Sequence, residues 1–125
     1  MTARSAAVTI PVMTTLLIVD DHGSFRAWAR RVLADDGYEI VGEAADGASA
    51  IEAVTALHPE VTLLDVLLPD MSGLDVADAI DAATTVVLTS SRSEADFGDE
   101  PRLAGRFIPK TDLSGVALAR AAARS

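Results

Sequence analysis

Short apolar runs rich in β-branched residues alternate along this chain with segments whose apolar residues recur at helical spacing. The runs lie at residues 16–19, 38–43, 61–64, 86–88 and 106–109. Several of them are almost continuously apolar, which is typical of parallel strands because helices cover both of their faces. The alternation therefore predicts βα units around one parallel sheet, an α/β fold with helices on both sides.

The first two intervening segments carry clear helix signals. After Ser24 apolar residues recur at i, i+3, i+4, i+7 and i+8, and Gly37 closes the pattern. The residues of this stripe are Phe25, Trp28, Ala29, Val32 and Leu33. In the second segment Asp46 can cap a helix that ends before Pro59. The expected buried stripe of that helix is Ile51, Val54 and Leu57.

The later helices are less regular. A short third helix is predicted after Gly73, and an Ala-rich last helix is predicted from Asp112 nearly to Ser125. Residues 93–105 should hold a fourth helix, but a glycine and a proline interrupt the pattern there and acidic residues dominate its first half. We therefore expect a doubly wound sheet with a shortened third helix and an irregular fourth helix.

The length of 125 residues fits one domain. Residues 1–13 are predicted to be a flexible N-terminal leader, and residues 14–125 are predicted to form the single domain. The apolar part of the leader runs directly into Asp20 and Asp21 and has no clear cleavage site, which argues against a signal peptide.

Composition narrows the class of protein further. Half of the residues are hydrophobic, so the chain can bury a core, and the formal net charge of −9 disfavours nucleic-acid binding by this chain alone. No run of about 18 uncharged apolar residues is present, so no membrane span is expected. The absence of cysteine excludes disulfides and fits a cytoplasmic location.

Polar residues follow the predicted strands at the point where each one ends. Asp20 and Asp21 follow the first strand, Asp65 the third, Thr89 the fourth and Lys110 the fifth. With strand order 2-1-3-4-5 these carboxyl ends meet near the place where the winding reverses, which is where ligands bind in such sheets. The side chains are therefore expected to converge on one site.

Three close carboxylates repel one another, so the site needs positive charge. One lysine and one divalent cation with oxygen ligands, Mg²⁺ or Mn²⁺, would balance three carboxylates. A carboxylate that attacks phosphorus gives an acyl phosphate, and the metal and the ammonium group would disperse the charge on the phosphoryl oxygens. The pattern thus favours phosphoryl transfer to an aspartate.

These residues resemble the receiver domain of two-component response regulators, over residues 14–124. The segments that carry the resemblance are 17–22 (LIVDDH), 63–74 (LLDVLLPDMSGL), 87–90 (VLTS) and 107–110 (FIPK). Each segment alone is a weak pattern, but their order on successive strand ends is specific. The last one is similar to receivers often joined to helix-turn-helix output domains of the NarL/LuxR type. The resemblance implies the flavodoxin-like (βα)5 fold.

The resemblance also implies roles for individual residues. Asp65 would be the phosphoacceptor, and Lys110 would pair with the phosphoryl group. The implied metal ligands are Asp20, Asp21, Asp65 and the main-chain carbonyl of Leu67. The implied switch residues are the hydroxyl of Thr89 and the aromatic ring of Phe107.

Partners and output follow from the same resemblance. The phosphodonor would be a histidine kinase or a phosphotransfer protein, and the output partner or output domain would lie outside this chain. The resemblance leaves room for a homodimer on activation. It describes a module that catalyses its own phosphorylation and dephosphorylation and is not a turnover enzyme.

The chain departs from the family pattern at three places. Thr111 follows the lysine where many receivers have proline, so the cis peptide usual there is not expected. Asp65 and Thr89 are 24 residues apart, which is shorter than usual and shortens the third helix. With the interrupted fourth helix, these departures concern the signalling surface and leave the site residues intact.

Three alternatives stay open. The chain could be an atypical receiver that binds a partner independently of phosphorylation. It could be an aspartate-nucleophile phosphatase of the haloacid-dehalogenase type, although Leu67 stands where those enzymes have a second aspartate. The site residues also have structural explanations: Asp20 and Asp21 as a helix-capping pair, Asp65 as a strand-terminal turn residue before Pro69, Thr89 as a β-former, and Lys110 as a solvated loop residue.

Overall fold

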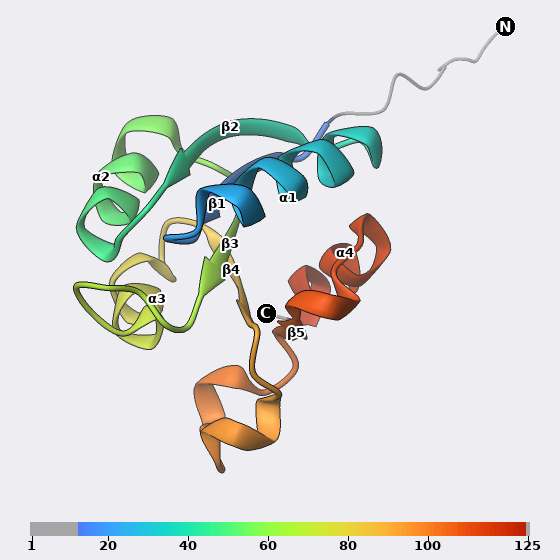
Figure 1. The fold of residues 1–125 in the computed structure, drawn as a ribbon. Coiled ribbons are helices and arrows are strands. Elements are labelled where there is room, and N and C mark those ends of the chain that lie inside the picture. The colour runs from blue at the N-terminus through green and yellow to red at the C-terminus, as the bar shows by residue number, and fades with distance from the viewer. Residues whose placement is uncertain (1–12, 125) are drawn as a thin grey trace, which may run out of the picture.

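The structure is a computed structural model and describes residues 13–124. Its five strands are β1 (Thr15–Val19), β2 (Glu39–Ala44), β3 (Val61–Asp65), β4 (Thr85–Ser90) and β5 (Phe107–Pro109). All neighbouring strands are parallel, and the order across the sheet is β2-β1-β3-β4-β5 (Figure 1). The predicted doubly wound, flavodoxin-like fold is therefore confirmed, and the strand ends differ from the prediction by at most two residues.

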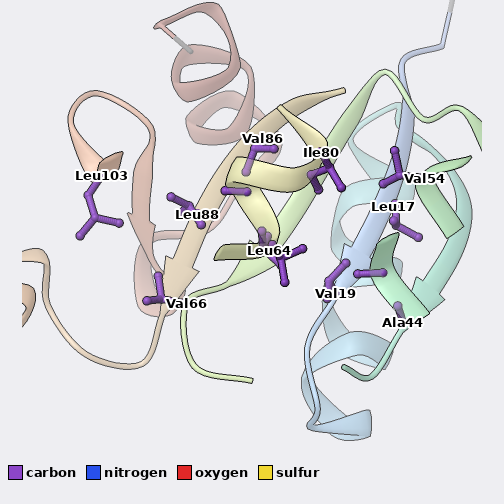
Figure 2. Packing of buried hydrophobic residues seen from close by; sticks show 13 residues of the cluster. Leu17, Val19, Ala44, Val54, Leu64, Val66, Ile80, Val86, Leu88 and Leu103 are labelled. Atoms are coloured by element: carbon purple, nitrogen blue, oxygen red, sulfur yellow. The ribbon is translucent and has the colours of Figure 1, made fainter. Parts of the chain in front are cut away.

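Four α-helices cover the two faces of the sheet. They are α1 (Gly23–Asp35), α2 (Gly47–Leu57), α3 (Gly73–Ile80) and α4 (Gly115–Arg124). Successive strand residues point to opposite faces, so Leu17 and Val19 pack with residues of α2 and α3, whereas Leu16 and Ile18 pack with residues of α1 and α4. Figure 2 shows the first of these two clusters between the sheet and its helices.

Two of the predicted buried stripes are narrower than expected. On α1 only Ala29 and Leu33 are fully buried, and Trp28 is 37% exposed with its ring against Phe25, the centroids 5.8 Å apart. On α2, Leu57 is 43% exposed. Both side chains lie at the edge of the apolar stripe of their helix, where a side chain is only partly covered by the rest of the protein.

The last helix begins later than predicted. Residues Lys110–Asp112 form a 3₁₀ turn, η3, and α4 starts at Gly115 in place of Asp112. The side chains of Ser114 and Asp36 accept the N–H groups of Ala117 and Gly115, at 3.1 and 2.8 Å, so the helix is capped from residue 114.

The predicted irregular fourth helix is replaced by two 3₁₀ turns, η1 (Glu94–Phe97) and η2 (Pro101–Leu103). Gly98 between them has a φ of 67° and Pro101 begins the second turn, so neither residue continues an α-helix. Leu103 is completely buried in the cluster on the α2 and α3 face. This segment therefore packs on the core through Leu103 although it forms no α-helix.

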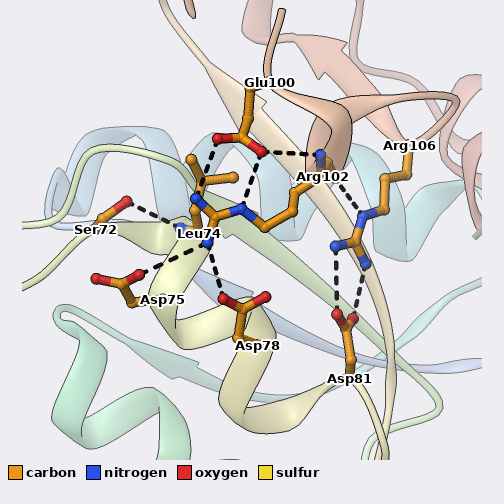
Figure 3. Close-up of polar contacts among 8 residues, drawn as sticks. All are labelled: Ser72, Leu74, Asp75, Asp78, Asp81, Glu100, Arg102 and Arg106. Atoms are coloured by element: carbon orange, nitrogen blue, oxygen red, sulfur yellow. Dashed lines mark hydrogen bonds and ion pairs between the residues drawn. The ribbon is translucent and has the colours of Figure 1, made fainter.

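Two arginines hold this segment to α3 (Figure 3). Arg102 donates to Asp78 at 2.8 Å and to Glu100 at 3.0 Å, and it holds the pKa of Glu100 at about 2. Arg106 donates to Asp81 at 2.7 Å and to the carbonyl of Arg102 at 2.7 Å. Ion pairs thus replace part of the packing that an α-helix would provide.

The predicted leader, residues 1–13, lies outside the described residues apart from Met13. Within residues 13–124 all peptide bonds are trans, as expected where Thr111 follows Lys110. No helix in this part of the chain is long and apolar enough to span a membrane.

Candidate functional site

Lys110 brings two of the predicted carboxylates together at the carboxyl edge of the sheet. Its Nζ lies 2.5 Å from Oδ2 of Asp20, at the end of β1, and 3.0 Å from Oδ2 of Asp65, at the end of β3. Asp20 is fully buried, Asp65 is nearly so, and only 14% of the lysine side chain is exposed. Lys110 is therefore not a solvated loop residue.

An aromatic ring completes the surroundings of the ammonium group. Lys110 Nζ lies 4.3 Å from the ring centroid of Phe25, in the first turn of α1. This distance is within the range of a cation–π interaction. The lysine head is thus held between two carboxylates and a ring.

Burial and the carboxylate pair set the charges at the site. Burial raises the pKa of Asp65 to about 6, and the neighbouring Asp20 adds to the effect. Burial also opposes the charge of Asp20, but Lys110, Asp65 and the backbone N–H of His22 outweigh it and lower the pKa of Asp20. For Lys110, burial is outweighed by the two carboxylates, which raise its pKa. One ammonium group thus does not fully offset two buried carboxylates.

Asp21 and His22 extend the site toward solvent. One ligand atom from each of Asp20, Asp21, His22 and Asp65 can be chosen so that all lie within 4.8 Å of one another. His22 Nδ1 lies 3.2 Å from Asp20 and 3.1 Å from Asp21, although its side chain is 67% exposed, as expected of a loop residue.

This set of donors fits a hard divalent cation. Among the described residues, Asp20 Oδ2 is a buried side-chain oxygen without a hydrogen bond of good geometry, even though the lysine nitrogen is 2.5 Å away. The three carboxylates of Asp20, Asp21 and Asp65 lie together here and suit Mg²⁺ or Mn²⁺, which prefer oxygen ligands. The structure therefore supports the metal site that was predicted from the strand ends.

Leu67 lies beside Asp65, as the resemblance implies. Its N–H donates to Asp65 Oδ1 at 2.8 Å, which turns the loop after β3 back toward the carboxylate. The loop is closed by the N–H of Gly73, which donates to the carbonyl of Val66 at 2.7 Å. Leu67 also forms an isolated antiparallel bridge with Ser72, and its carbonyl as a metal ligand stays a prediction.

Thr89 is next to Asp65 in the sheet but its hydroxyl faces the other neighbour. The register pairs Thr89 with Asp65 on β3 and with Ile108 on β5. The buried hydroxyl donates to the carbonyl of Ile108 at 2.6 Å. In this conformation the hydroxyl of Thr89 therefore donates its hydrogen bond to β5 and not toward Asp65.

Phe107 is half-buried beside this contact. Its ring packs edge-on against Phe97 of η1, with centroids 6.0 Å apart. The structure thus connects the predicted switch ring to the segment that replaces the fourth helix, and it leaves a switching role as a prediction.

Arg26 was not among the residues predicted for the site. Its Nη1 donates to the main-chain carbonyl of Asp20 at 2.6 Å. The available signal was an arginine in the first turn of the helix that follows the acidic pair, where a long side chain reaches back toward the strand end.

Comparisons with known proteins show which family the chain resembles. The family model described as "Response regulator receiver domain" matches residues 16–105. A putative transcriptional regulator of Pseudomonas aeruginosa is 34% identical over 86% of this chain and 55% of its own length. The transcriptional regulatory protein PdtaR of Mycobacterium tuberculosis is 35% identical over 84% of this chain and 52% of its own length. The chain thus spans about half the length of these relatives.

A solved structure gives the same result for the fold. The signal receiver domain of the putative response regulator NarL from Mycobacterium tuberculosis superposes with a TM-score of 0.74 and 33% identity, covering 89% of this chain and 94% of that chain. With the fold, the converging strand ends and the family match over most of the domain, this chain belongs to the response regulator receiver domain family.

Proposed function

We propose that this chain accepts a phosphoryl group on Asp65, from a histidine kinase or a phosphotransfer protein, and passes the signal on through a changed surface. The observation that carries the proposal is the buried contact of Lys110 with both Asp20 and Asp65. A carboxylate at this place has a lysine and a second acid beside it, as phosphoryl transfer to an aspartate requires.

The residues divide the chemistry among them. An oxygen of Asp65 forms a bond to phosphorus while the bond from phosphorus to the donor breaks, giving an acyl phosphate. Lys110 lies 3.0 Å from Asp65 and would bind a phosphoryl oxygen. Thr89 would rotate from the carbonyl of Ile108 to donate to another oxygen, and Phe107 would change position with it.

A divalent cation completes the site. Asp20, Asp21, Asp65 and the carbonyl of Leu67 would hold Mg²⁺ or Mn²⁺. When bound, the ion would supply positive charge against the phosphoryl oxygens. The close grouping of Asp20, Asp21 and Asp65 supports this assignment.

The setting of the module is part of the proposal. Residues 14–125 would form the single receiver domain of a cytoplasmic signalling protein. Because the chain spans about half of the relatives named above, the output domain or partner would lie outside it. A homodimer on activation would be one form of output, and turnover of an external substrate is not part of the function.

One experiment tests the phosphorylation. The protein is incubated with acetyl phosphate and Mg²⁺ and run on a phosphate-affinity gel, with Asp65→Asn and an EDTA-treated sample as controls. We expect a shifted band for the wild type alone. A shift that persists in Asp65→Asn, or no shift in the wild type, would contradict the proposal.

The replaced fourth helix favours one second candidate, a receiver that binds its partner independently of phosphorylation. In the family this helix belongs to the usual output face, and here two 3₁₀ turns take its place. Partner affinity that does not change when beryllofluoride occupies the site would support this candidate. A change in affinity would favour the phosphorylation-dependent function.

A further inference from the structure

Arg26 connects helix α1 to the backbone of the acidic pair. Its Nη1 donates to the carbonyl of Asp20 at 2.6 Å, and its Nε donates to Glu43 Oε1 on β2 at 3.0 Å. Only 21% of the arginine side chain is exposed. The guanidinium group therefore spans the end of β1 and the end of β2 from a mostly buried position.

The backbone of Asp20 is held on both sides. Its N–H donates to the carbonyl of Ala44 at 3.0 Å, and its carbonyl accepts from Arg26. Ala44 follows Glu43 directly, so two adjacent residues of β2 fix the two ends of Asp20, one directly and one through the arginine. The peptide between Asp20 and Asp21 has little freedom to rotate while these contacts persist.

Glu43 is a firm anchor for the arginine. Arg30, one turn further along α1, donates to its other oxygen at 2.7 Å. Arg30, joined by Arg26, lowers the pKa of Glu43, so the anchor is charged at neutral pH. Arg30 has no contact with a site residue in the part of the chain that the structure describes, although it shares the same anchor.

We infer that Arg26, anchored by Glu43, is a positioning residue that orients the carboxylates of Asp20 and Asp21 for the divalent cation. This inference rests on the proposed function, because it assigns a role toward the cation of that same site. A group that orients metal ligands without touching the metal typically changes affinity by about 10-fold or more when it is removed.

Loss of positioning and loss of charge would change the affinity for Mg²⁺ in opposite directions. Arg26 is a cation beside an acidic site, so loss of its charge alone would make the site bind Mg²⁺ more tightly. Loss of positioning would make the site bind Mg²⁺ less tightly. The direction of the change therefore distinguishes the two.

The test is Mg²⁺ titration of the wild type, Arg26→Gln and the matched control Arg30→Gln, followed by calorimetry and by the fluorescence of Trp28. We expect Arg26→Gln to weaken Mg²⁺ binding about 10-fold. Arg30→Gln also removes one positive charge that pairs with Glu43. Its affinity for Mg²⁺ should stay within about twofold of that of the wild type. At saturating Mg²⁺ the rate of phosphorylation by acetyl phosphate should return to near the wild-type rate in Arg26→Gln.

Unchanged or tighter Mg²⁺ binding by Arg26→Gln would overturn the inference, and so would equal weakening by the two arginine variants. If Arg26→Gln does not fold, Arg26→Lys keeps the positive charge but loses the planar group that reaches both the Asp20 carbonyl and Glu43, and it should weaken Mg²⁺ binding more than the matched Arg30→Lys does. Equal affinities there would also overturn the inference. A wild type that binds no Mg²⁺ and is not phosphorylated would instead refute the proposed function.

Discussion

At the scale of the residue, the site is a balance between one buried ammonium group and two buried carboxylates. Lys110 contacts both Asp20 and Asp65, and the two acids respond in opposite ways, with the pKa of Asp20 lowered and that of Asp65 raised to about 6. The folded protein therefore carries an electrostatic cost at neutral pH that a cation would relieve.

This cost predicts that Asp65→Asn stabilises the metal-free protein. The folded pKa of about 6 lies above the ordinary value of 3.8, so the cost of charging Asp65 is fully present above pH 6 and vanishes as the pH falls below about 4. We expect a gain on the order of 2 kcal/mol in the free energy of unfolding at pH 7.5.

The measurement is urea unfolding of both proteins in EDTA at pH 7.5 and at pH 4. The gain should shrink at the lower pH, and the exposed Asp21→Asn serves as the control. A loss of stability at pH 7.5, or an equal gain at both values of pH, would be inconsistent with a raised pKa of Asp65.

The site residues were predictable from the sequence because each one ends a strand, and parallel strands end at the same edge of the sheet. Their orientations were not predictable. Thr89 donates to Ile108, away from Asp65, because the strand register offers its hydroxyl a nearby carbonyl on β5. Arg26 was missed because its partner is a main-chain carbonyl, and an arginine in the first turn of a helix does not by itself show which carbonyl it will reach.

At the scale of the element, short segments with special backbone requirements shape the site. The loop after β3 returns so closely that a Cβ atom on Gly73, the first residue of α3, would lie 2.1 Å from the carbonyl oxygen of Asp65. The nearest atoms, from Asp65 and Val66, are all backbone atoms, which cannot move aside as the end of a flexible side chain can. Gly23, the first residue of α1, has only the flexible end of Arg26 nearby, at 3.6 Å.

These two glycines give a matched pair of variants. Gly73→Ala should lower the free energy of unfolding by about 3 kcal/mol or prevent folding, because the loop would have to move away from Asp65. Gly23→Ala should be neutral or slightly stabilising, because alanine favours the helix. Urea unfolding followed by circular dichroism measures both, and similar stabilities of the two variants would contradict the close approach.

The segment that replaces the fourth helix depends on ion pairs to α3. Arg102→Ala removes the contacts with Asp78 and Glu100, so the amides of residues 94–104 should exchange with solvent at least roughly twofold faster. The exposed Arg120→Ala is the control, and hydrogen exchange followed by mass spectrometry is the measurement. Unchanged exchange in this segment would contradict a stabilising role for the ion pairs of Arg102.

The elements themselves were largely predictable, because apolar runs and helical stripes mark them directly. The departures arise where tertiary contacts decide. The last helix starts at Gly115 because Asp36, far away in the sequence, accepts its N–H. Residues 94–103 form two 3₁₀ turns because one glycine and one proline break the helix while Leu103 keeps the segment on the core.

At the scale of the whole molecule, the acidic site lies close to a contact that leads to the segment that replaces the fourth helix. The carboxyl edge holds the acidic site, and the aromatic contact between Phe107 and Phe97 links the neighbouring strand β5 to η1. A change at Thr89 and Phe107 would therefore reach the segment that departs most from the family pattern. We expect the output of this chain to be carried there and not on a regular helix.

Phosphorylation of Asp65 is tested most directly by finding the residue to which a phosphoryl group is attached. The protein is treated with acetyl phosphate and Mg²⁺, and its intact mass and peptide masses are measured beside those of Asp65→Asn and of a sample without Mg²⁺. We expect one added phosphoryl group, on the peptide that contains Asp65, only in the wild type with Mg²⁺. A phosphoryl group on another residue, or none at all, would contradict phosphorylation of Asp65.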